Sequence, residues 1–541
     1  MAFEDYLLKE NIIDELACKQ IKNTENTFLE ITNRLSEDIY FEHMLSFYKL
    51  REVKNTDNLA IDFDNSSKVD DFYVLVAKDL ICLKTNYSSN VWLILNPDNF
   101  KEIDKIRQNT INPIFAVARK VEFQAIYNRV VKPAEVACRA EEISKTTENK
   151  VMNVDYTSQA KALYKSLLDA AIENRASDMH IIPMSNKVKI AFRIDGKIEN
   201  YCYIPLNILN NLKNVISNEG QLPSNSIAIP QEGIIKYEYK GQFTNVRINI
   251  IPTLDTFDIN LRFLSSNTKS INEIGFLKDE QETLLKVVEQ TKGLIIMTGP
   301  TGSGKSTTLY AALSGILGTG RKIMSLEDPV EINVDGFTQV TIRTEFAFGF
   351  PEGVATAMRH DSDVIYIGEC KDVIVAKETI KMADTGHLAL TTLHTNDSFG
   401  AISRLRNLEI PEYAIGDVLT VVIAQRLVRR VCDKCFETYS LEKKHKWREL
   451  FNLGDEEIIL ARGKGCSYCD GRGYKDRLAI VEFLLVNNEI REGIQTGANR
   501  AKLYKSARQN GFETLLENGI KKALLHLTTL DELVPYARDL L

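Results

Sequence analysis

The chain contains 541 residues, of which 44% are hydrophobic and 26% charged, and it carries a formal net charge of −7. This balance is typical of a soluble globular protein of about three domains, and it argues against a protein that coats nucleic acid, because such a protein needs a basic surface. No segment approaches about 18 consecutive apolar residues, and the acidic N-terminus lacks the features of a signal peptide. We therefore expect a cytoplasmic protein without a transmembrane segment.

The composition divides the chain into three domains and two linkers. Residues 1–135 mix helical and β-like patterns and carry no recognisable chemistry. The polar segment 136–157 predicts a linker, and residues 158–264 predict an α+β domain. A second linker is expected at 265–275. Residues 276–541 alternate strand patterns with helix patterns, which is typical of an α/β domain with a parallel sheet.

The second of these domains shows both periodicities. A helix is predicted over 158–174, because apolar residues recur there on one face. These residues are Ala160, Leu163, Leu167, Leu168 and Ala171. Alternating apolar and polar residues then predict strands at 187–195, 233–240, 245–251 and 257–264.

The third domain opens with a glycine-rich loop. Residues 299–306 read Gly-Pro-Thr-Gly-Ser-Gly-Lys-Ser and match the phosphate-binding pattern G-x-x-x-x-G-K-[ST], between a strand-like run and a helix-compatible stretch. The N–H groups of such a loop bind phosphate oxygens, Lys305 neutralises the β- and γ-phosphates, and Ser306 holds Mg²⁺. We predict a nucleoside triphosphate site made by Gly299, Pro300, Thr301, Gly302, Ser303, Gly304, Lys305, Ser306 and Thr307.

Two acidic segments follow the loop. Residues 363–369 form an apolar strand that ends in Gly-Glu, which places Glu369 at the carboxyl edge of the sheet, where open α/β sheets bind ligands. Residues 325–331 carry three carboxylates, of which Glu331 is the last, and on spacing alone a solvated turn is an equally good interpretation. A nucleotide site needs one acid to organise the metal and another to polarise water. We favour Glu369 for Mg²⁺ and Glu331 for water, although the sequence leaves the opposite assignment open.

Residues 385–395 contain a buried-strand pattern, LALTTL, with His387 and His394 at its two ends. A lone histidine is more often an ordinary polar residue than a catalytic group. Two histidines that flank one strand downstream of a phosphate loop favour a role in sensing the γ-phosphate.

In this order the segments resemble one family, the secretion ATPases of type IV pili and type II secretion. The resemblance covers roughly residues 156–490 and rests on SLEDPVE (325–331), DVIYIGE (363–369), TGHLALTTLHTND (385–397), AQRL (424–427), ASDMH (176–180), FRIDG (192–196) and PQEG (230–233). It implies a RecA-like ATPase domain, a PAS-like second domain, a hexameric ring and ATP bound between the two domains. It also implies that Arg247 and Arg262 reach the phosphates, where they would stabilise charge that develops during transfer.

The cysteines predict a metal site. Cys432 and Cys435 form one C-x₂-C pair, and Cys466 and Cys469 form a second. Four thiolates at this spacing predict a closed, tetrahedral, structural Zn²⁺ site in a subdomain of about 430–475. Within the family resemblance, this insertion and an extra N-terminal domain imply an assembly motor rather than a retraction motor.

The resemblance therefore implies a cytoplasmic homohexamer that hydrolyses ATP to ADP and phosphate and powers pilin polymerisation through an inner-membrane platform protein. Residues 1–135 would dock on a membrane partner. Three alternatives stay open: a type II secretion pseudopilus ATPase, a DNA-translocating ATPase of conjugation or competence, and a zinc-stabilised scaffold without turnover. The acidic net charge and the lack of an aromatic, basic platform disfavour nucleic-acid binding, and the intact acidic and histidine segments disfavour the scaffold.

Overall fold

The computed structural model describes residues 268–538 continuously and, before them, residues 8–9, 51–52, 80–84, 90–94, 114–117, 132–148, 156–223 and 229–264. Four strands of the first predicted domain are described and form a sheet in the order β1-β4-β3-β2. They are β1 (Arg51–Glu52), β2 (Leu80–Lys84), β3 (Asn90–Ile94) and β4 (Ile114–Val117). The surface that we predict to dock on a partner lies outside the described residues.

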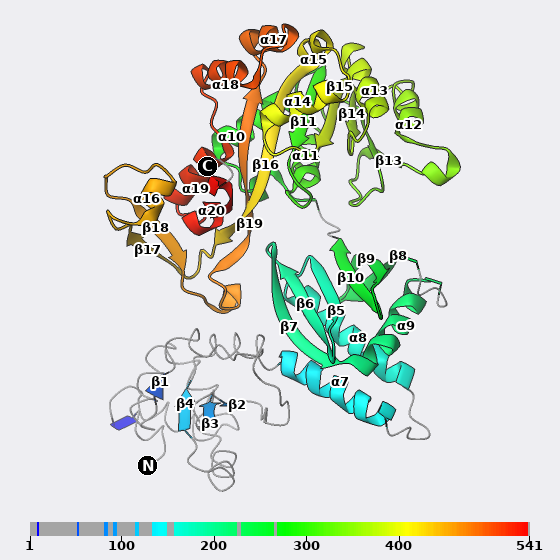
Figure 1. Cartoon of the computed structure of the whole chain (residues 1–541), viewed down its shortest axis with the longest axis vertical. Helices are drawn as coiled ribbons and strands as arrows, with labels where there is room; N and C mark the ends of the chain where they lie inside the picture. Colours follow the sequence, from blue (N-terminus) through cyan, green and yellow to red (C-terminus); the bar gives the residue numbers. More distant parts are fainter. Residues whose placement is uncertain are drawn as a thin grey trace.

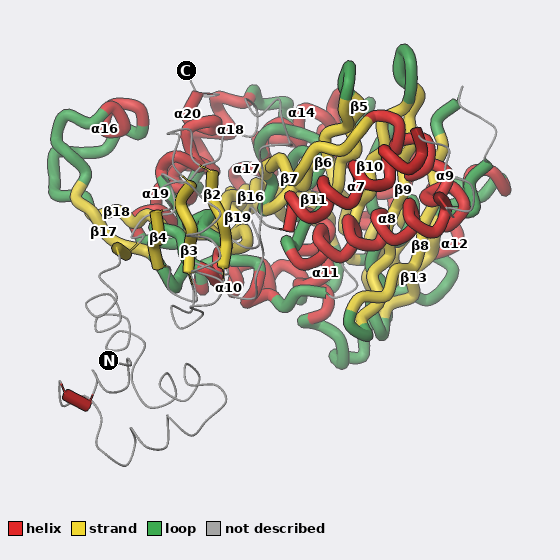
Figure 2. Tube along the Cα trace, turned by 90° about the horizontal axis from the view of Figure 1, so that it is seen from below, coloured by secondary structure: helices red, strands yellow, loops and turns green. Residues whose placement is uncertain are grey.

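The second domain is a six-stranded antiparallel sheet with helices on one face (Figures 1 and 2). The sheet order is β7-β6-β5-β10-β9-β8, and the predicted strands are confirmed. The strands are β5 (Asp178–Pro183), β6 (Lys187–Ile194), β7 (Lys197–Pro205), β8 (Gln231–Tyr239), β9 (Gln242–Pro252) and β10 (Phe257–Leu264). The helices are α7 (Lys132–Glu148), α8 (Tyr156–Glu173) and α9 (Leu209–Glu219). Helix α8 buries the predicted apolar face against this sheet.

The prediction of a linker at 136–157 is wrong over much of its length. Helix α7 (Lys132–Glu148) occupies it and packs with α8 and the sheet. Val136, Ala140 and Ile143 recur at helical spacing and are buried there, so the few apolar residues of a polar segment suffice to hold a helix. A low apolar content did not distinguish a linker from a helix with a narrow apolar face.

The phosphate-loop domain contains a seven-stranded sheet in the order β13-β12-β14-β15-β11-β16-β19. All neighbouring strands are parallel except β16 and β19, which are antiparallel. The strands are β11 (Gly293–Thr298), β12 (Ile323–Glu327), β13 (Phe337–Thr341), β14 (Val364–Ile367), β15 (Leu388–Leu393), β16 (Leu419–Val431) and β19 (Tyr474–Leu485). Strands β11, β12, β14 and β15 are buried along their whole length, as expected when helices cover both faces.

Helices on each side of this sheet form two separate apolar cores. One core contains α10 (Lys278–Val288) and α11 (Lys305–Ser314). The other contains α12 (Phe350–Ala357), α13 (Val373–Asp384), α14 (Ser398–Asn407), α15 (Glu412–Val418), α17 (Asn488–Gln495) and α18 (Arg500–Gln509). The predicted fold class, an α/β phosphate-loop domain preceded by an α+β domain, is confirmed.

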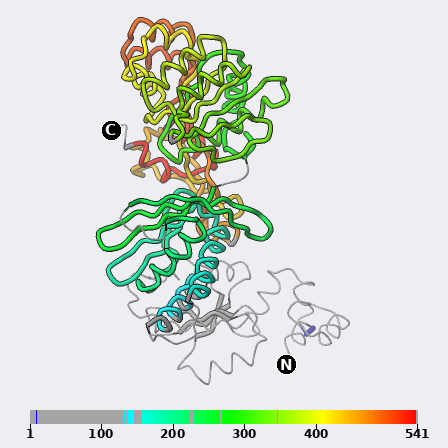
Figure 3. The backbone as a smooth tube through the Cα atoms, turned by 90° about the vertical axis from the view of Figure 1, so that its right-hand side faces the viewer, coloured from blue at the N-terminus to red at the C-terminus, as the bar shows by residue number. Residues whose placement is uncertain are grey.

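The segment between β16 and β19 forms a small subdomain. It contains β17 (Phe436–Ser440), α16 (Lys446–Leu450) and β18 (Ile459–Gly463), and it packs with α19 (Leu515–Leu524) and α20 (Val534–Arg538). The long pair β16 and β19 extends from the main sheet toward the second domain (Figures 1 and 3). Across the described part of the chain, no helix combines the length and apolarity that a membrane crossing requires.

Candidate nucleotide and metal sites

The phosphate loop connects the end of β11 to the start of α11. Gly299 and Gly304 adopt positive φ angles of 150° and 82°, which side chains disfavour. A Cβ atom at Gly299 would lie 2.5 Å from the main-chain oxygen of Gln425, so the loop can pack this closely against β16 only with glycine. Helix α11 begins at Lys305, so the free N–H groups of its first turn lie at the phosphate loop, where they can bind an anion.

Lys305 folds back onto the loop. Its Nζ donates hydrogen bonds to the main-chain oxygens of Gly299 (2.7 Å) and Pro300 (3.1 Å). Burial lowers the pKa of Lys305 to about 8; the carboxylate of Glu369 acts in the opposite direction, and the charge of Arg426 lowers the pKa further. The buried cation has main-chain partners and no ion pair within 4 Å among the described residues, so an incoming phosphate would supply its missing counter-charge.

Nucleotide affinity is expected to fall as the pH rises above about 8. Bound phosphates raise the pKa of Lys305, so above the free-state pKa of about 8 binding must take up a proton. Below that pH the lysine is charged in both states, and its contribution stays constant. Isothermal titration calorimetry near pH 7 and pH 9, in two buffers of different ionisation enthalpy, measures this uptake. A Lys305→Arg variant is the control, because arginine stays charged. Wild-type protein that takes up no proton near pH 9 would contradict the expectation.

Strand β16 supports the loop from the side. Gln425 donates from Nε2 to the main-chain oxygen of Ser303 (2.7 Å) and accepts from the hydroxyl of Thr308 (2.9 Å). Arg426 donates from a guanidinium nitrogen to the main-chain oxygen of Asn396 (2.7 Å), just after the histidine segment. The sequence pointed to AQRL only through a resemblance, since nothing local shows that a distant strand would contact the loop.

The acidic segment 325–331 is split by the structure. Glu327 ends β12, is buried, and accepts hydrogen bonds from the hydroxyls of Tyr310 and Ser325, the latter at 2.6 Å. Burial raises the pKa of Glu327. Glu331, by contrast, is exposed in the turn that follows. The buried member of the cluster, Glu327, was missed by sequence reasoning, although its place at the end of an apolar strand was a usable signal.

Glu369 and His394 lie together at the carboxyl edge of the sheet. Nε2 of His394 is 3.2 Å from Oε1 of Glu369, and Nζ of Lys371 is 3.5 Å from the other carboxylate oxygen. Burial lowers the pKa of His394; the charges of Lys305 and Lys371 act in the same direction, and Glu369 opposes them. The lowered pKa favours the neutral imidazole, which can accept or donate a hydrogen bond. Tyr366 of the same edge donates to the hydroxyl of Ser306 (3.4 Å).

His387 lies at the other edge. In the parallel pair of β11 and β15, Thr298 lies opposite Leu393 and Gly293 lies opposite Leu388. His387 precedes Leu388, so it is separated from His394 by the length of β15, about 20 Å. Its Nδ1 is 3.2 Å from the main-chain oxygen of Met382. The expectation that both histidines sense one phosphate is therefore wrong for a single chain.

The two predicted arginines lie on the helix-free face of the second domain. Arg262 on β10 and Arg247 on β9 are opposite each other in register. Nε of Arg262 is 2.9 Å from the buried carboxylate of Asp178, and Arg193 lies 3.6 Å from the same group. Burial acts to raise the pKa of Asp178, but Arg262 and Arg193 hold it below its usual value. Within the described residues, neither Arg247 nor Arg262 contacts the phosphate loop.

The four predicted cysteine ligands converge. Their sulfurs lie within 4.8 Å of one another, and three of the separations are 3.7 to 3.8 Å. A tetrahedron of sulfurs about 2.3 Å from Zn²⁺ has edges of about 3.8 Å, so the spacing fits this metal. The main-chain N–H groups of Cys466 (3.2 Å) and Gly473 (3.3 Å) donate to Sγ of Cys469. These donors hold the pKa of Cys469 below its usual value, against the effect of burial.

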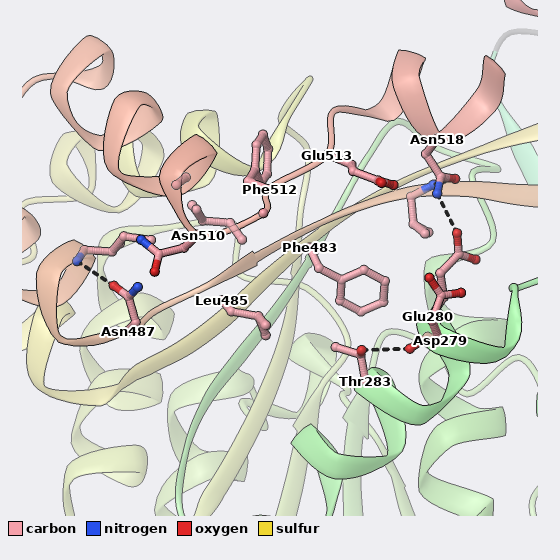
Figure 4. A pocket seen from close by; sticks show the side chains of 15 residues that line it. Asp279, Glu280, Thr283, Phe483, Leu485, Asn487, Asn510, Phe512, Glu513 and Asn518 are labelled. Atoms are coloured by element: carbon pink, nitrogen blue, oxygen red, sulfur yellow. Dashed lines mark hydrogen bonds between the residues drawn. The ribbon is translucent and has the colours of Figure 1, made fainter. Parts of the chain in front are cut away.

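A separate pocket lies on the outer strand of the main sheet (Figure 4). It is bordered by Asp279 and Glu280 of α10, Phe483 and Leu485 of β19, and the turn at 510–513. Its lining includes no residue of the phosphate loop and none from the carboxyl edge of β14 or β15. This pocket is therefore not the nucleotide site.

The fold and the loop define a phosphate-loop nucleotide-binding protein with an α+β domain ahead of the nucleotide-binding domain. A family model described as "Type II/IV secretion system protein" matches residues 154–535. The chain belongs to this family.

Two curated relatives and one solved structure illustrate the similarity. The chain is 34% identical over 463 residues to the type IV pilus assembly ATPase PilB of Thermus thermophilus. This alignment covers 82% of the chain but only 51% of the length of PilB. It is 33% identical over 393 residues to the type II secretion system protein E of Xanthomonas campestris pv. campestris, covering 71% of the chain and 69% of that protein. The X-ray structure of the Legionella pneumophila ATPase DotB aligns with a TM-score of 0.53 at 18% identity over 70% of the chain and 96% of that structure, a similarity of fold alone.

Proposed function

We propose that the chain is an ATP hydrolase that works as a homohexamer in the cytoplasm, attached to the inner membrane through partner proteins. In this proposal it powers pilin polymerisation in a type IV pilus. The observation that carries the nucleotide site is the meeting of Lys305, Ser306, Glu369 and His394 at one edge of the sheet. Curated relatives named as pilus assembly and type II secretion proteins support the biological setting.

The site residues divide the work as follows. Lys305 and the loop N–H groups bind the phosphates, and the hydroxyl of Ser306 and the carboxylate of Glu369 offer the oxygen ligands that Mg²⁺ prefers. Glu331, exposed in the segment after β12, polarises the attacking water. His394, neutral and held by Glu369, contacts the γ-phosphate. Arg247 and Arg262 stabilise charge on the phosphates when the second domain closes on the loop.

Glutamine at the true general base is expected to leave ATP binding intact and to lower kcat at least about tenfold. Glu331→Gln and Glu369→Gln are compared by phosphate release and by calorimetric titration of nucleotide. Glu492→Gln, an exposed change on α17, is the matched control and keeps wild-type activity. If both variants at the site keep kcat within that factor, both roles are misassigned.

The type II secretion pseudopilus is the second candidate function, since the relatives include both kinds of system at nearly equal identity, 34% and 33%. Deleting the gene in its host separates the two. Loss of surface fibres supports the pilus motor, whereas secreted enzymes retained in the periplasm support the secretion motor. Residues 1–135 are proposed to dock on the membrane partner, and their removal tests that step in the same host.

A further inference from the structure

One arginine of the metal-binding subdomain, Arg472, contacts the second domain. Arg472 lies in the loop after Cys469, and its side chain is only 9% exposed. Its Nε donates to both carboxylate oxygens of Glu199 on β7, at 3.1 and 3.0 Å. A further guanidinium nitrogen donates to Asn174, at the end of α8, at 3.3 Å. The planar guanidinium of Arg472 therefore connects the two domains through residues that lie 273 positions apart in the sequence.

The position of Arg472 depends on the cysteine cluster. Its neighbour Gly473 donates its N–H to Sγ of Cys469 (3.3 Å) and accepts from the N–H of Cys432 (3.0 Å). Asp470, next to Cys469, accepts from Arg472 at 3.0 Å. The loop is thus held from both C-x₂-C pairs. Without a metal, four sulfurs within 4.8 Å are either protonated or mutually repelling thiolates, and the loop loses this support.

Among the described residues, two further ion pairs cross the same boundary, and each includes a side chain that is more than half exposed. Arg175 of the second domain bonds to Asp476 of β19, whose side chain is 55% exposed, and Lys197 lies 3.4 Å from Glu532. Exposed pairs of this kind contribute little, whereas a nearly buried guanidinium with three partners holds a fixed geometry. Among the ion pairs that cross this boundary in the described residues, Arg472 is the least exposed side chain.

We propose that Arg472 is a positioning residue that makes the placement of the second domain depend on zinc. The zinc-bound cysteine cluster fixes the loop that contains Arg472, and Arg472 in turn fixes β7 through its hydrogen bonds to Glu199. The second domain carries Arg247 and Arg262, so their placement relative to the phosphate loop depends on a metal that takes no part in the chemistry. The proposal rests on the zinc site predicted from the cysteine spacing, but not on the identity of the transported subunit.

The test measures the distance between domains in the full-length chain. Fluorophores are introduced through a non-canonical amino acid at Leu254 (97% exposed) and Tyr413 (65% exposed), so that all cysteines stay free. One doubly labelled chain is diluted into excess unlabelled chains, and single-molecule energy transfer is recorded under reducing conditions. The samples are wild type with and without a zinc chelator, Arg472→Ala, Arg472→Lys, and the Glu199→Arg/Arg472→Glu exchange. Arg462→Ala is the control, since that exposed arginine contacts Glu437 and Tyr439 of its own subdomain.

We expect a single narrow distance distribution for the zinc-bound wild type and for zinc-bound Arg462→Ala. We expect this distribution to broaden when zinc is chelated from the wild type, and also in Arg472→Ala. Elemental analysis should show that Arg472→Ala still binds zinc. Chelating that zinc should not broaden the distance distribution of Arg472→Ala any further. The exchanged pair restores the narrow distribution more fully than Arg472→Lys. A wild-type distribution in Arg472→Ala overturns the proposal. Chelation that broadens Arg472→Ala as much as wild type also overturns it, because zinc would then act by another route. Purified protein without zinc overturns the dependence on metal while leaving the nucleotide site untouched.

Discussion

Replacing Lys305 with alanine is expected to abolish ATP turnover while the fold stays intact. The side chain is buried, and within the described residues its hydrogen bonds go to the loop's own main-chain oxygens, so its removal is expected to leave the surrounding strands and helices in place. The phosphates lose their main neutralising partner, and losses of about 100-fold or more in kcat are typical when one such stabilising group is removed.

Phosphate release measures the turnover of Lys305→Ala, and circular dichroism with a thermal scan measures its fold. Lys381→Ala, an exposed lysine on α13, is the control and is expected to match wild type in both. Hydrolysis at a near wild-type rate by Lys305→Ala would contradict the assignment of the nucleotide site.

Replacing Cys432 with serine is expected to remove zinc and unfold the subdomain of about 430–475 locally. Structural zinc contributes folding free energy directly, about 10–16 kcal/mol in small finger peptides. The elements of this subdomain are short, and its apolar core against α19 and α20 does not include the loops that carry the cysteines, so we expect these loops and the adjoining strands to lose their structure without the metal. The main sheet keeps its own two cores, so nucleotide binding is expected to be retained, and under the proposed function pilus assembly is expected to fail.

Elemental analysis and amide hydrogen exchange check this second expectation. Exchange in β17 and β18 should rise sharply in Cys432→Ser and stay unchanged in β11 and α11. Lys434→Ala, an exposed change between the first two ligands, should keep one zinc per chain. Freshly purified wild-type protein without zinc, or unchanged exchange in Cys432→Ser, would refute a structural metal here.

The parts of the fold that sequence reasoning predicted are those determined locally. The strand before the loop, the glycines and the start of α11 follow each other without interruption, so periodicity and a motif sufficed. The strands of the second domain followed from alternation. The C-x₂-C pairs were recognisable because each pair makes its own turn, and only their convergence needed the structure.

The remaining features depend on which strands become neighbours. The order β12-β14-β15-β11-β16 brings Gln425 to the loop, and no local pattern encodes that order. The two ends of β15 look alike in sequence, yet only one end lies at the loop, so His394 and His387 could not be distinguished. Arg472 resembled any surface arginine between glycines, since its partner Glu199 comes from a different domain.

Strand β16 connects the phosphate loop with the cysteine cluster along one stretch of chain. Midway along it Gln425 contacts the phosphate loop, and directly after its end Cys432 enters the cysteine cluster. The stretch between them spans about 23 Å of extended chain and pairs with β19, with an irregularity of register between Arg429 and Val431. One continuous strand therefore connects the support of the phosphate loop with the cysteine cluster, beside which Arg472 contacts the second domain.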